Sequence, residues 1–505
     1  MRLVFVLFDS LNRLALEHYG GKHVRTPNFT RFAKRAVSFN RHYVGSLPCM
    51  PARRDLHTGR INFLHRSWGP LEPFDNSFPQ LLSESGAYTH IITDHSHYFH
   101  DGGATYHNRY DSWELVRGQA NDHWKGVVEP PLEEFAATYH PSQLRPFIHS
   151  DRINRLYVKE EKDFACPQIF DLASHFLDVN GRAKNWLLQI ECFDPHEPFY
   201  APPRFRDAYP TAYGGPVFDW PMYGKVKESR DEIDEVRANY AALVAMCDEY
   251  FGRLLDQFDR MDLWRDTALV VTTDHGFLLG EHDWWGKNLM PVYDELARIP
   301  LMIYHPDYAS SGGSMREALT QATDIMPTFL DWFGVEAPKE VTGTSLTPLL
   351  AAEEKIRNSA IYGYFGAACN ITDGRYTYLR YPESMSAEGL HEYTLMPTRF
   401  GRLFSIKELV DATLAPPFDF TKGLSVLKVS PQMMADGRVS AMDGVVAFED
   451  AKTRLFDIER DPSQSTPLAD SELENRLCGE MARQLRLHDA PPSLFTRLGL
   501  DGGLA

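Results

Sequence analysis

Short apolar runs that stop abruptly at a polar residue recur along this chain. They are rich in Val, Ile and Leu, and the stretches between them carry helical patterning. Runs of this length and composition are typical of strands in a mostly parallel sheet that is buried on both faces. The runs cover 3–8, 91–92, 186–190 and 268–273, and the polar residues that follow them are Asp9, Asp94, Glu191 and Asp274.

A long amphipathic helix is predicted between the third and fourth of these runs. Apolar residues recur there at intervals of three, four and one from Ile233 to Phe258, which corresponds to about seven helical turns. A helix in this place would connect two strands of one sheet. Because ligands of open α/β sheets bind beyond the carboxyl ends of the strands, we expect Asp9 and Asp274 to converge there.

The pattern changes after about residue 360, where short aromatic and β-branched runs are broken by Gly, Pro and Asp. The run from Ile371 to Tyr381 is an example, and a closing helix is expected near Ser471 to Leu487. These features predict a smaller antiparallel sheet. We therefore expect an α/β fold with a large central, mostly parallel sheet flanked by helices, divided into a catalytic domain (1–360) and a C-terminal subdomain (361–505).

Composition and charge narrow the choice of partners. The chain has 505 residues, of which 43% are apolar, so it can form one large enzyme fold with an added subdomain. Its 52 basic and 69 acidic residues give a net charge of −17, which argues against nucleic acid as a partner. Because the overall field repels anions, an anionic ester would need a local cluster of cations to bind it.

The N-terminus and the cysteines bear on the cellular compartment. The apolar run at 3–8 is shorter than the core of a signal peptide, and no apolar window reaches the roughly 20 residues of a membrane span. The six cysteines are scattered without paired spacing, which fits free thiols in a reducing compartment. We expect a cytoplasmic protein that does not enter a membrane.

The segment from Cys49 to Arg60 carries most of the chemical information. It reads Cys-Met-Pro-Ala-Arg-Arg-Asp-Leu-His-Thr-Gly-Arg, and it fits the pattern C-x-P-x-R followed by L-x-T-G-R at every fixed position. A single cysteine is usually a buried apolar thiol. Agreement over the whole segment instead favours a nucleophile at Cys49.

Through this segment the chain resembles the sulfatases and the related phosphonate monoester hydrolases of the alkaline phosphatase superfamily. The resemblance continues over most of the chain, at 26–28, 272–276, 279–282, 285–287, 293–300, 324–328, 343–350 and 455–462. It implies an alkaline-phosphatase-like fold and oxidation of Cys49 to formylglycine by a formylglycine-generating enzyme.

The hydrated aldehyde has two hydroxyls. One attacks sulfur or phosphorus, and the other later loses its proton so that the bond to the enzyme breaks.

The resemblance also implies a metal centre. Asp9, Cys49, Asp274 and His275 occupy the positions of the family's metal ligands. Carboxylates suit a hard divalent ion, so calcium is expected first, while the imidazole leaves manganese and zinc open. Many sulfatases have a second Asp after the first, and phosphonate hydrolases have a Gln. This chain has Ser10, an uncharged and weaker ligand that we leave out of the metal site.

Three more residues are assigned catalytic roles through the resemblance. Arg53 matches the arginine that holds the formylglycine hydrate, and Lys287 matches the lysine that contacts the transferred oxygens. His196 matches the histidine near the leaving oxygen. Their expected roles are charge stabilisation and protonation of the leaving group, and both Lys287 and His196 are expected to contact the substrate.

The loop 94–97 departs from the family pattern. Arylsulfatases have Lys-x-His here and phosphonate hydrolases have Tyr and Thr, whereas this chain reads Asp-His-Ser-His. Alternating histidines in a loop more often line a pocket than bind a second metal. We expect His97 to contact the substrate.

The leading hypothesis is therefore arylsulfatase-like hydrolysis of a small sulfate ester. The alternative is hydrolysis of phosphonate monoesters or phosphodiesters, or of both classes, because a tetrahedral anion with three peripheral oxygens fits the same cations. A third hypothesis is a binding protein with unmodified Cys49, which would not need Arg53, Lys287 and His196. The tail 491–505 could pack on a second subunit, so a homo-oligomer is left open.

Overall fold

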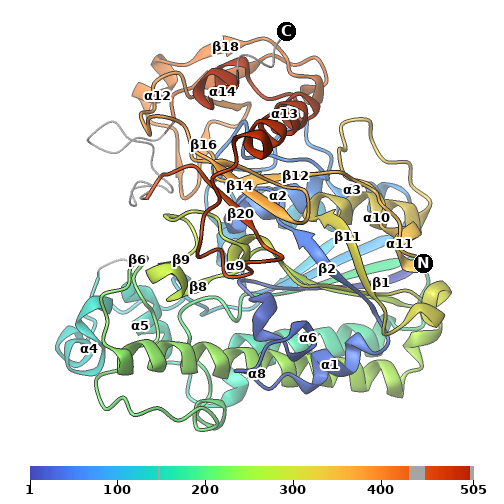
Figure 1. Ribbon diagram of the computed structural model, residues 1–505. Helices are drawn as coiled ribbons and strands as arrows, with labels where there is room; N and C mark the ends of the chain where they lie inside the picture. Colours follow the sequence, from blue (N-terminus) through green and yellow to red (C-terminus); the bar gives the residue numbers. More distant parts are fainter. Residues whose placement is uncertain (146–147, 432–449, 501–505) are drawn as a thin grey trace.

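The structure is a computed structural model that describes residues 1–145, 148–431 and 450–500, and its centre is an eight-stranded sheet (Figure 1). Across the sheet the strands are β11 (Met315–Gln321), β2 (Val37–Tyr43), β10 (Leu301–Tyr304), β7 (Ala268–Thr273), β1 (Arg2–Phe8), β5 (Trp186–Cys192), β3 (Tyr88–Thr93) and β4 (Ser112–Leu115). Neighbouring strands are parallel, except where β10 pairs with β2 and β7. The prediction of a large, mostly parallel sheet is confirmed.

Helices cover both faces of this sheet (Figure 1). One face carries α1 (Pro27–Ala33), α6 (Ala165–Asn180) and α8 (Arg230–Arg260), and the other carries α2 (Cys49–Thr58), α3 (Phe78–Glu84) and α10 (Ile325–Phe333). The alternation of side chains along β1 explains how both layers are held. Val4, Val6 and Phe8 pack toward α8, whereas Leu3, Phe5 and Leu7 pack toward α2 and α10.

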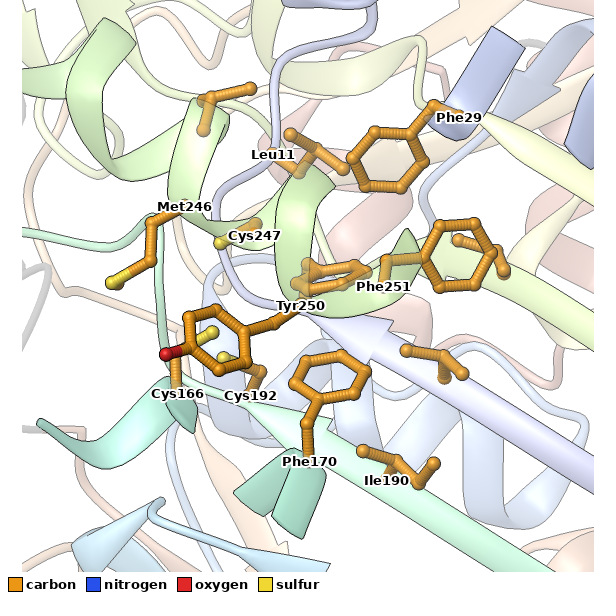
Figure 2. Packing of buried hydrophobic residues seen from close by; sticks show 14 of the residues in the cluster. Leu11, Phe29, Cys166, Phe170, Ile190, Cys192, Met246, Cys247, Tyr250 and Phe251 are labelled. Carbon is orange, nitrogen blue, oxygen red and sulfur yellow. The ribbon is translucent and has the colours of Figure 1, made fainter. Parts of the chain in front are cut away.

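The amphipathic helix predicted at 233–258 is α8, which begins three residues earlier and ends two residues later. Ser229 and Glu232 form a capping box at its start, in which each side chain accepts a hydrogen bond from the other residue's backbone. The apolar side of α8 joins the core shown in Figure 2, where the rings of Phe251 and Phe29 stack with their centroids 5.0 Å apart.

The topology brings distant parts of the chain to one edge of the sheet. β1 lies between β5 and β7, so Phe8 is in register with Cys192 on one side and with Thr273 on the other. Asp9 and Asp274 directly follow these parallel strands. Their side chains therefore emerge at the same edge, as expected for an open α/β sheet.

A smaller antiparallel sheet lies beside the main body, with the order β12 (Ala360–Gly363), β13 (Cys369–Thr372), β14 (Tyr376–Arg380) and β20 (Arg454–Asp457). The predicted run at 371–381 contains the end of β13 and all of β14, separated by a turn in which Gly374 has φ +94°. The predicted closing helix is α13 (Ser471–Leu487), and it packs on this sheet. The domain boundary at 360 stays a prediction.

The C-terminal tail packs on its own chain up to residue 500. α14 (Pro492–Arg497) contributes Phe495 to an apolar cluster that also contains Leu485 of α13 and Leu500. Residues 501–505, which belong to the tail proposed to contact a second subunit, lie outside the described residues. Among the helices of the described ranges, none combines the length and apolarity needed to cross a bilayer.

The buried histidine of α2 gives a first prediction. Burial lowers the pKa of His57 to about 3 from its ordinary 6.5, and its Nδ1 lies 2.8 Å from the Ser77 hydroxyl. As the pH falls, the unfolded chain takes up a proton at this residue while the folded chain does not, so the free energy of unfolding decreases. We predict that His57→Gln weakens this pH dependence by about 1 kcal/mol per pH unit between about pH 7 and pH 5.

Urea unfolding of the wild type and of His57→Gln across this pH range measures how steeply the free energy of unfolding of each protein depends on pH. The packing that His57→Gln loses lowers the free energy of unfolding by a similar amount at every pH. The slope of this free energy against pH is therefore the quantity to compare. Equal slopes would show that His57 does not remain neutral in the folded protein.

Candidate active site

Cys49 is the first residue of α2, and its side chain is 1% exposed. Every residue of this helix is buried. The Sγ atom lies 3.2 Å from Nε2 of His275. Burial, and next the charge of Asp9, raise the pKa of the Cys49 thiol well above its ordinary value. The unmodified thiol is therefore neutral and a poor nucleophile.

Four residues proposed as metal ligands are brought together at the edge of the sheet. One ligand atom each from Asp9, Cys49, Asp274 and His275 lies within 4.8 Å of the other three, and all four residues are buried. His275 Nδ1 lies 2.9 Å from the carbonyl oxygen of Gly276, where it donates a hydrogen bond. Its Nε2 is then unprotonated, lies 3.3 Å from Asp274 Oδ2 and can accept the Cys49 S–H, and this is the tautomer that a metal-bound imidazole needs.

Arg53 lies one helical turn after Cys49, so both side chains occupy the same face of α2. Its guanidinium donates to Oδ2 of Asp9 at 2.8 Å, to Oδ2 of Asp274 at 2.6 Å and to Oε1 of Glu191 at 2.8 Å. It also donates to the carbonyl oxygen of Cys49 at 3.1 Å. Although burial disfavours the charge, these carboxylates raise the pKa of Arg53 well above its ordinary value.

Ser10 connects Lys287 to Asp9. The Ser10 hydroxyl donates to Asp9 Oδ1 at 2.8 Å and accepts a hydrogen bond from Lys287 Nζ at 3.0 Å. Its backbone N–H donates to Asp274 Oδ1 at 3.1 Å. Although burial alone would raise it, the pKa of Asp9 is held well below its ordinary value by Arg53 and Lys287. Ser10 therefore orders the site by hydrogen bonds without adding a charge.

His196 and Glu197 follow β5 at the same edge. His196 Nδ1 lies 2.6 Å from the carbonyl oxygen of Glu197, and Lys287 Nζ lies 4.0 Å from the carboxylate of Glu197. Burial and the charge of Lys287 lower the pKa of His196 well below its ordinary value. The neutral ring donates from Nδ1, so its Nε2 carries a proton only when the ring is charged, which a bound anion would favour.

The loop after β3 forms a wall of rings beside these residues. The ring centroid of His95 lies 4.7 Å from that of His97 and 5.1 Å from that of Phe193, and Phe193 lies 4.0 Å from His196. Neither ring nitrogen of His95 has a hydrogen-bond partner among the described residues. Asp94 accepts a hydrogen bond from the Phe193 backbone at 2.7 Å. The loop thus places imidazoles near the site, while Asp94 is bound to the backbone after β5.

Sequence reasoning assigned no role to Glu191 or Glu197, and it treated His95 only as one of the alternating histidines that line a pocket. Glu191 was noted as the polar residue that ends a strand, and the structure shows that it holds Arg53. The signal was present, because Glu191 follows a buried run just as Asp9 and Asp274 do. Glu197 and His95 lie in loops, where only the folded chain reveals their neighbours.

Comparison with known proteins agrees with this architecture. A family model described as Sulfatase matches residues 2–335, and one described as N-sulphoglucosamine sulphohydrolase, C-terminal, matches residues 280–405. N-acetylglucosamine-6-O-sulfatase of Bacteroides thetaiotaomicron is 27% identical, over 72% of this chain and 74% of that protein. Multifunctional alkaline phosphatase superfamily protein PehA of Trinickia caryophylli is 26% identical, over 65% of this chain and 72% of that protein.

Solved structures show the same fold. The phosphonate monoester hydrolase of Agrobacterium radiobacter has a TM-score of 0.65 at 16% identity, over 96% of this chain and 95% of that chain. A structure in complex with its substrate D-glucosamine-2-N,6-O-disulfate has a TM-score of 0.66 at 18% identity, over 97% of this chain and 99% of that chain. The sheet and the residues at its edge define an enzyme of the alkaline phosphatase superfamily. Within it, the chain belongs to the sulfatase family and is a sulfuric ester hydrolase.

The contact between Glu191 and Arg53 gives a prediction about activity. Glu191 Oε2 also accepts hydrogen bonds from the Tyr98 hydroxyl at 2.9 Å and from Gln189 Nε2 at 3.0 Å, so Glu191→Gln keeps the shape but removes the charge that holds Arg53. We predict that kcat for an aryl sulfate falls about ten- to a hundredfold, with little change in KM.

Steady-state kinetics of Glu191→Gln beside Tyr98→Phe tests this expectation. Tyr98→Phe removes one hydrogen bond to the same carboxylate but leaves its charge, so it should lose less activity. Equal losses, or full activity of Glu191→Gln, would show that the charge of Glu191 is not needed.

Proposed function

We propose that this protein hydrolyses a small sulfate ester, with formylglycine at position 49 as the nucleophile and one divalent cation at the edge of the sheet. The observation that supports this most directly is the convergence of Asp9, Cys49, Asp274 and His275 within 4.8 Å. Arg53 and Lys287 border the same group. A sulfatase needs this combination of a cation, a nucleophile and fixed positive charges around one tetrahedral anion.

The residues at the site fit a divalent cation by charge and by donor type. Four buried carboxylates face two buried cationic side chains, which leaves a formal charge of −2 that one divalent ion neutralises. The carboxylates are those of Asp9, Asp274, Glu191 and Glu197, and the cations are Arg53 and Lys287. Oxygen donors favour calcium, and the His275 imidazole keeps manganese and zinc open. Such an ion would polarise the ester and make a hydroxyl nucleophilic near neutral pH.

Conversion of Cys49 implies a second protein as a partner. Because the thiol is 1% exposed and lies in a fully buried helix, a formylglycine-generating enzyme would have to reach it before this part of the chain folds. The aldehyde hydrate would supply one hydroxyl for attack and one for release of the product. The raised pKa of the thiol supports this reading, since the unmodified side chain would be a poor nucleophile.

The chain's own side chains would divide the remaining work. Although burial lowers the pKa of Lys287, the carboxylates of Glu197 and Asp9 raise it, so Lys287 stays charged and can neutralise the oxygens of the transferred group. Arg53 would hold residue 49 through the backbone contact at 3.1 Å. His196 would donate a proton to the leaving oxygen once the bound anion has favoured its charged form.

The organic part of the ester would lie against the ring wall of the loop after β3. The ring of His97 lies 4.6 Å from that of Phe400 and 5.7 Å from that of Trp68. Flat apolar faces of this kind suit a planar or apolar organic group. We therefore propose His97 as a substrate contact.

A phosphonate monoester or phosphodiester is the second candidate substrate. The fold similarity to the phosphonate monoester hydrolase of Agrobacterium radiobacter supports it. Both substrate classes present peripheral oxygens to the same cations.

The proposed function predicts three linked results. Protein made together with a formylglycine-generating enzyme should carry the mass of formylglycine at position 49. It should turn over an aryl sulfate more than about a hundredfold faster than phenylphosphonate or a bis-aryl phosphate. Cys49→Ala should be inactive yet folded, because a small apolar side chain replaces the thiol.

Mass spectrometry of the peptide that contains position 49, followed by kinetics on the three substrates, measures these results. A hundredfold preference for either phosphorus ester would assign the alternative function. Activity in protein whose Cys49 is entirely unmodified would overturn the proposed nucleophile.

The substrate contact gives a separate prediction. Because His97 faces the organic group and not the reacting atoms, His97→Ala should raise KM for an aryl sulfate about tenfold while kcat stays within about twofold. His100→Ala changes a neighbouring ring of the same loop, 5.7 Å from His97, and serves as the matched control. Equal effects of the two substitutions, or a loss confined to kcat, would contradict the assignment.

A further inference from the structure

Three cysteines that are far apart in the sequence meet in the core behind the active site. Cys166 lies at the start of α6, Cys192 is the last residue of β5, and Cys247 lies in the middle of α8 (Figure 2). Their sulfur atoms lie within 4.8 Å of one another, each residue is buried, and all three are free thiols. Three free thiols at this spacing could be inert packing or could be ligands.

Two buried carboxylates beside Cys192 add possible ligands to the cluster. A carboxylate oxygen of Asp94 and one of Asp194 lie within 4.8 Å of each other and of the Cys192 sulfur. Asp94 is 1% exposed, and its Oδ2 has no hydrogen-bond partner among the described residues. Asp194 is 3% exposed and accepts one hydrogen bond from Gln119 at 2.7 Å. Ionised carboxylates against an apolar thiol cluster cost free energy, and either protonation or a bound cation removes this cost.

We propose that Cys166, Cys192 and Cys247, with one carboxylate of the Asp94–Asp194 pair, form a second metal site that binds a zinc-class cation. Three thiolates and one carboxylate oxygen are a complete tetrahedral ligand set for this ion. The carboxylates lie within 4.8 Å of the Cys192 sulfur, and one of them would have to move toward the sulfurs of Cys166 and Cys247 to complete the set. Sulfur atoms around tetrahedral zinc are about 3.8 Å apart, so the observed cluster would have to contract by about 1 Å or less. Binding releases the thiol protons, and the ion neutralises most of the resulting negative charge.

The site is distinct from the catalytic one, although β5 connects them. Side chains alternate along the strand, so Glu191 points to Arg53 while Cys192 points to α6 and α8. The backbone carbonyl of Cys192 accepts a hydrogen bond from the Asp9 N–H at 2.9 Å. An ion on Cys192 would therefore tie both helices to the strand end that supports Asp9 and His196. Its role would be structural, since its ligands face away from the Cys49 side of the sheet.

Cobalt replaces zinc in such sites and gives a sulfur-to-cobalt charge-transfer band only when thiolates bind it. The experiment uses the full-length chain with Cys49→Ala, so that no thiolate of the catalytic site can contribute to the band. The protein is produced in cobalt-containing medium, because a fully buried site is filled during folding. We expect the charge-transfer band. When zinc replaces cobalt, we expect about one equivalent of zinc per chain at this site to survive dialysis, beyond any zinc that the catalytic residues retain.

Two variants in the same background locate the ligands. Cys247→Ser should lose the band and the retained zinc, and it should unfold at a lower temperature. Cys369→Ser changes a buried cysteine of β13 outside the cluster and should keep both. Absence of the band in folded Cys49→Ala protein would overturn the proposal, even if Cys247→Ser failed to fold. A band that persists in Cys247→Ser would overturn it equally.

Discussion

The guanidinium of Arg53 holds the candidate active site together. It is 1% exposed and contacts three carboxylates that arrive from three different strand ends, Asp9 after β1, Asp274 after β7 and Glu191 at the end of β5. Carboxylates this close repel one another strongly in a medium of low dielectric constant. A planar group with five donors can satisfy all three in different directions, which a lysine ammonium cannot do with fixed geometry. Removing it would leave buried charges uncompensated.

This arrangement depends on the order of strands in the sheet. Only because β1 lies between β5 and β7 do the three carboxylates reach one guanidinium. α2 then has to begin above the same edge, so that Cys49 and Arg53, one turn apart, both face it. Asp55, in the second half of α2, joins the segments on both sides of this helix, since its carboxylate accepts hydrogen bonds from the Ser46 hydroxyl at 2.8 Å and from the Asn62 backbone at 3.0 Å.

Much of this could be predicted from the sequence, because strand ends and helical spacing are local signals. The apolar runs before Asp9 and Asp274 indicated the sheet edge, and the periodicity at 233–258 indicated α8 to within a few residues. The contacts of Ser10 could not be predicted, because no pattern in the sequence links its hydroxyl to Lys287 or its backbone to Asp274. The gathering of Cys166, Cys192 and Cys247 was missed for the same reason. Their spacing in the chain carries no pattern, since one helix, one strand and a second helix each supply a single sulfur.

The serine at position 10 also bears on which ester fits the site. A second Asp at that position would add one negative charge beside Lys287, whereas the Ser10 hydroxyl accepts the Lys287 hydrogen bond and stays neutral. The site is therefore one unit more positive toward an incoming anion. Sulfate monoesters and phosphonate monoesters each carry one negative charge, so this change attracts both equally. If the organic group lies against His97 as proposed, discrimination between them would come from shape and contacts around His97, Trp68 and Phe400, where the loop 94–97 departs from both patterns.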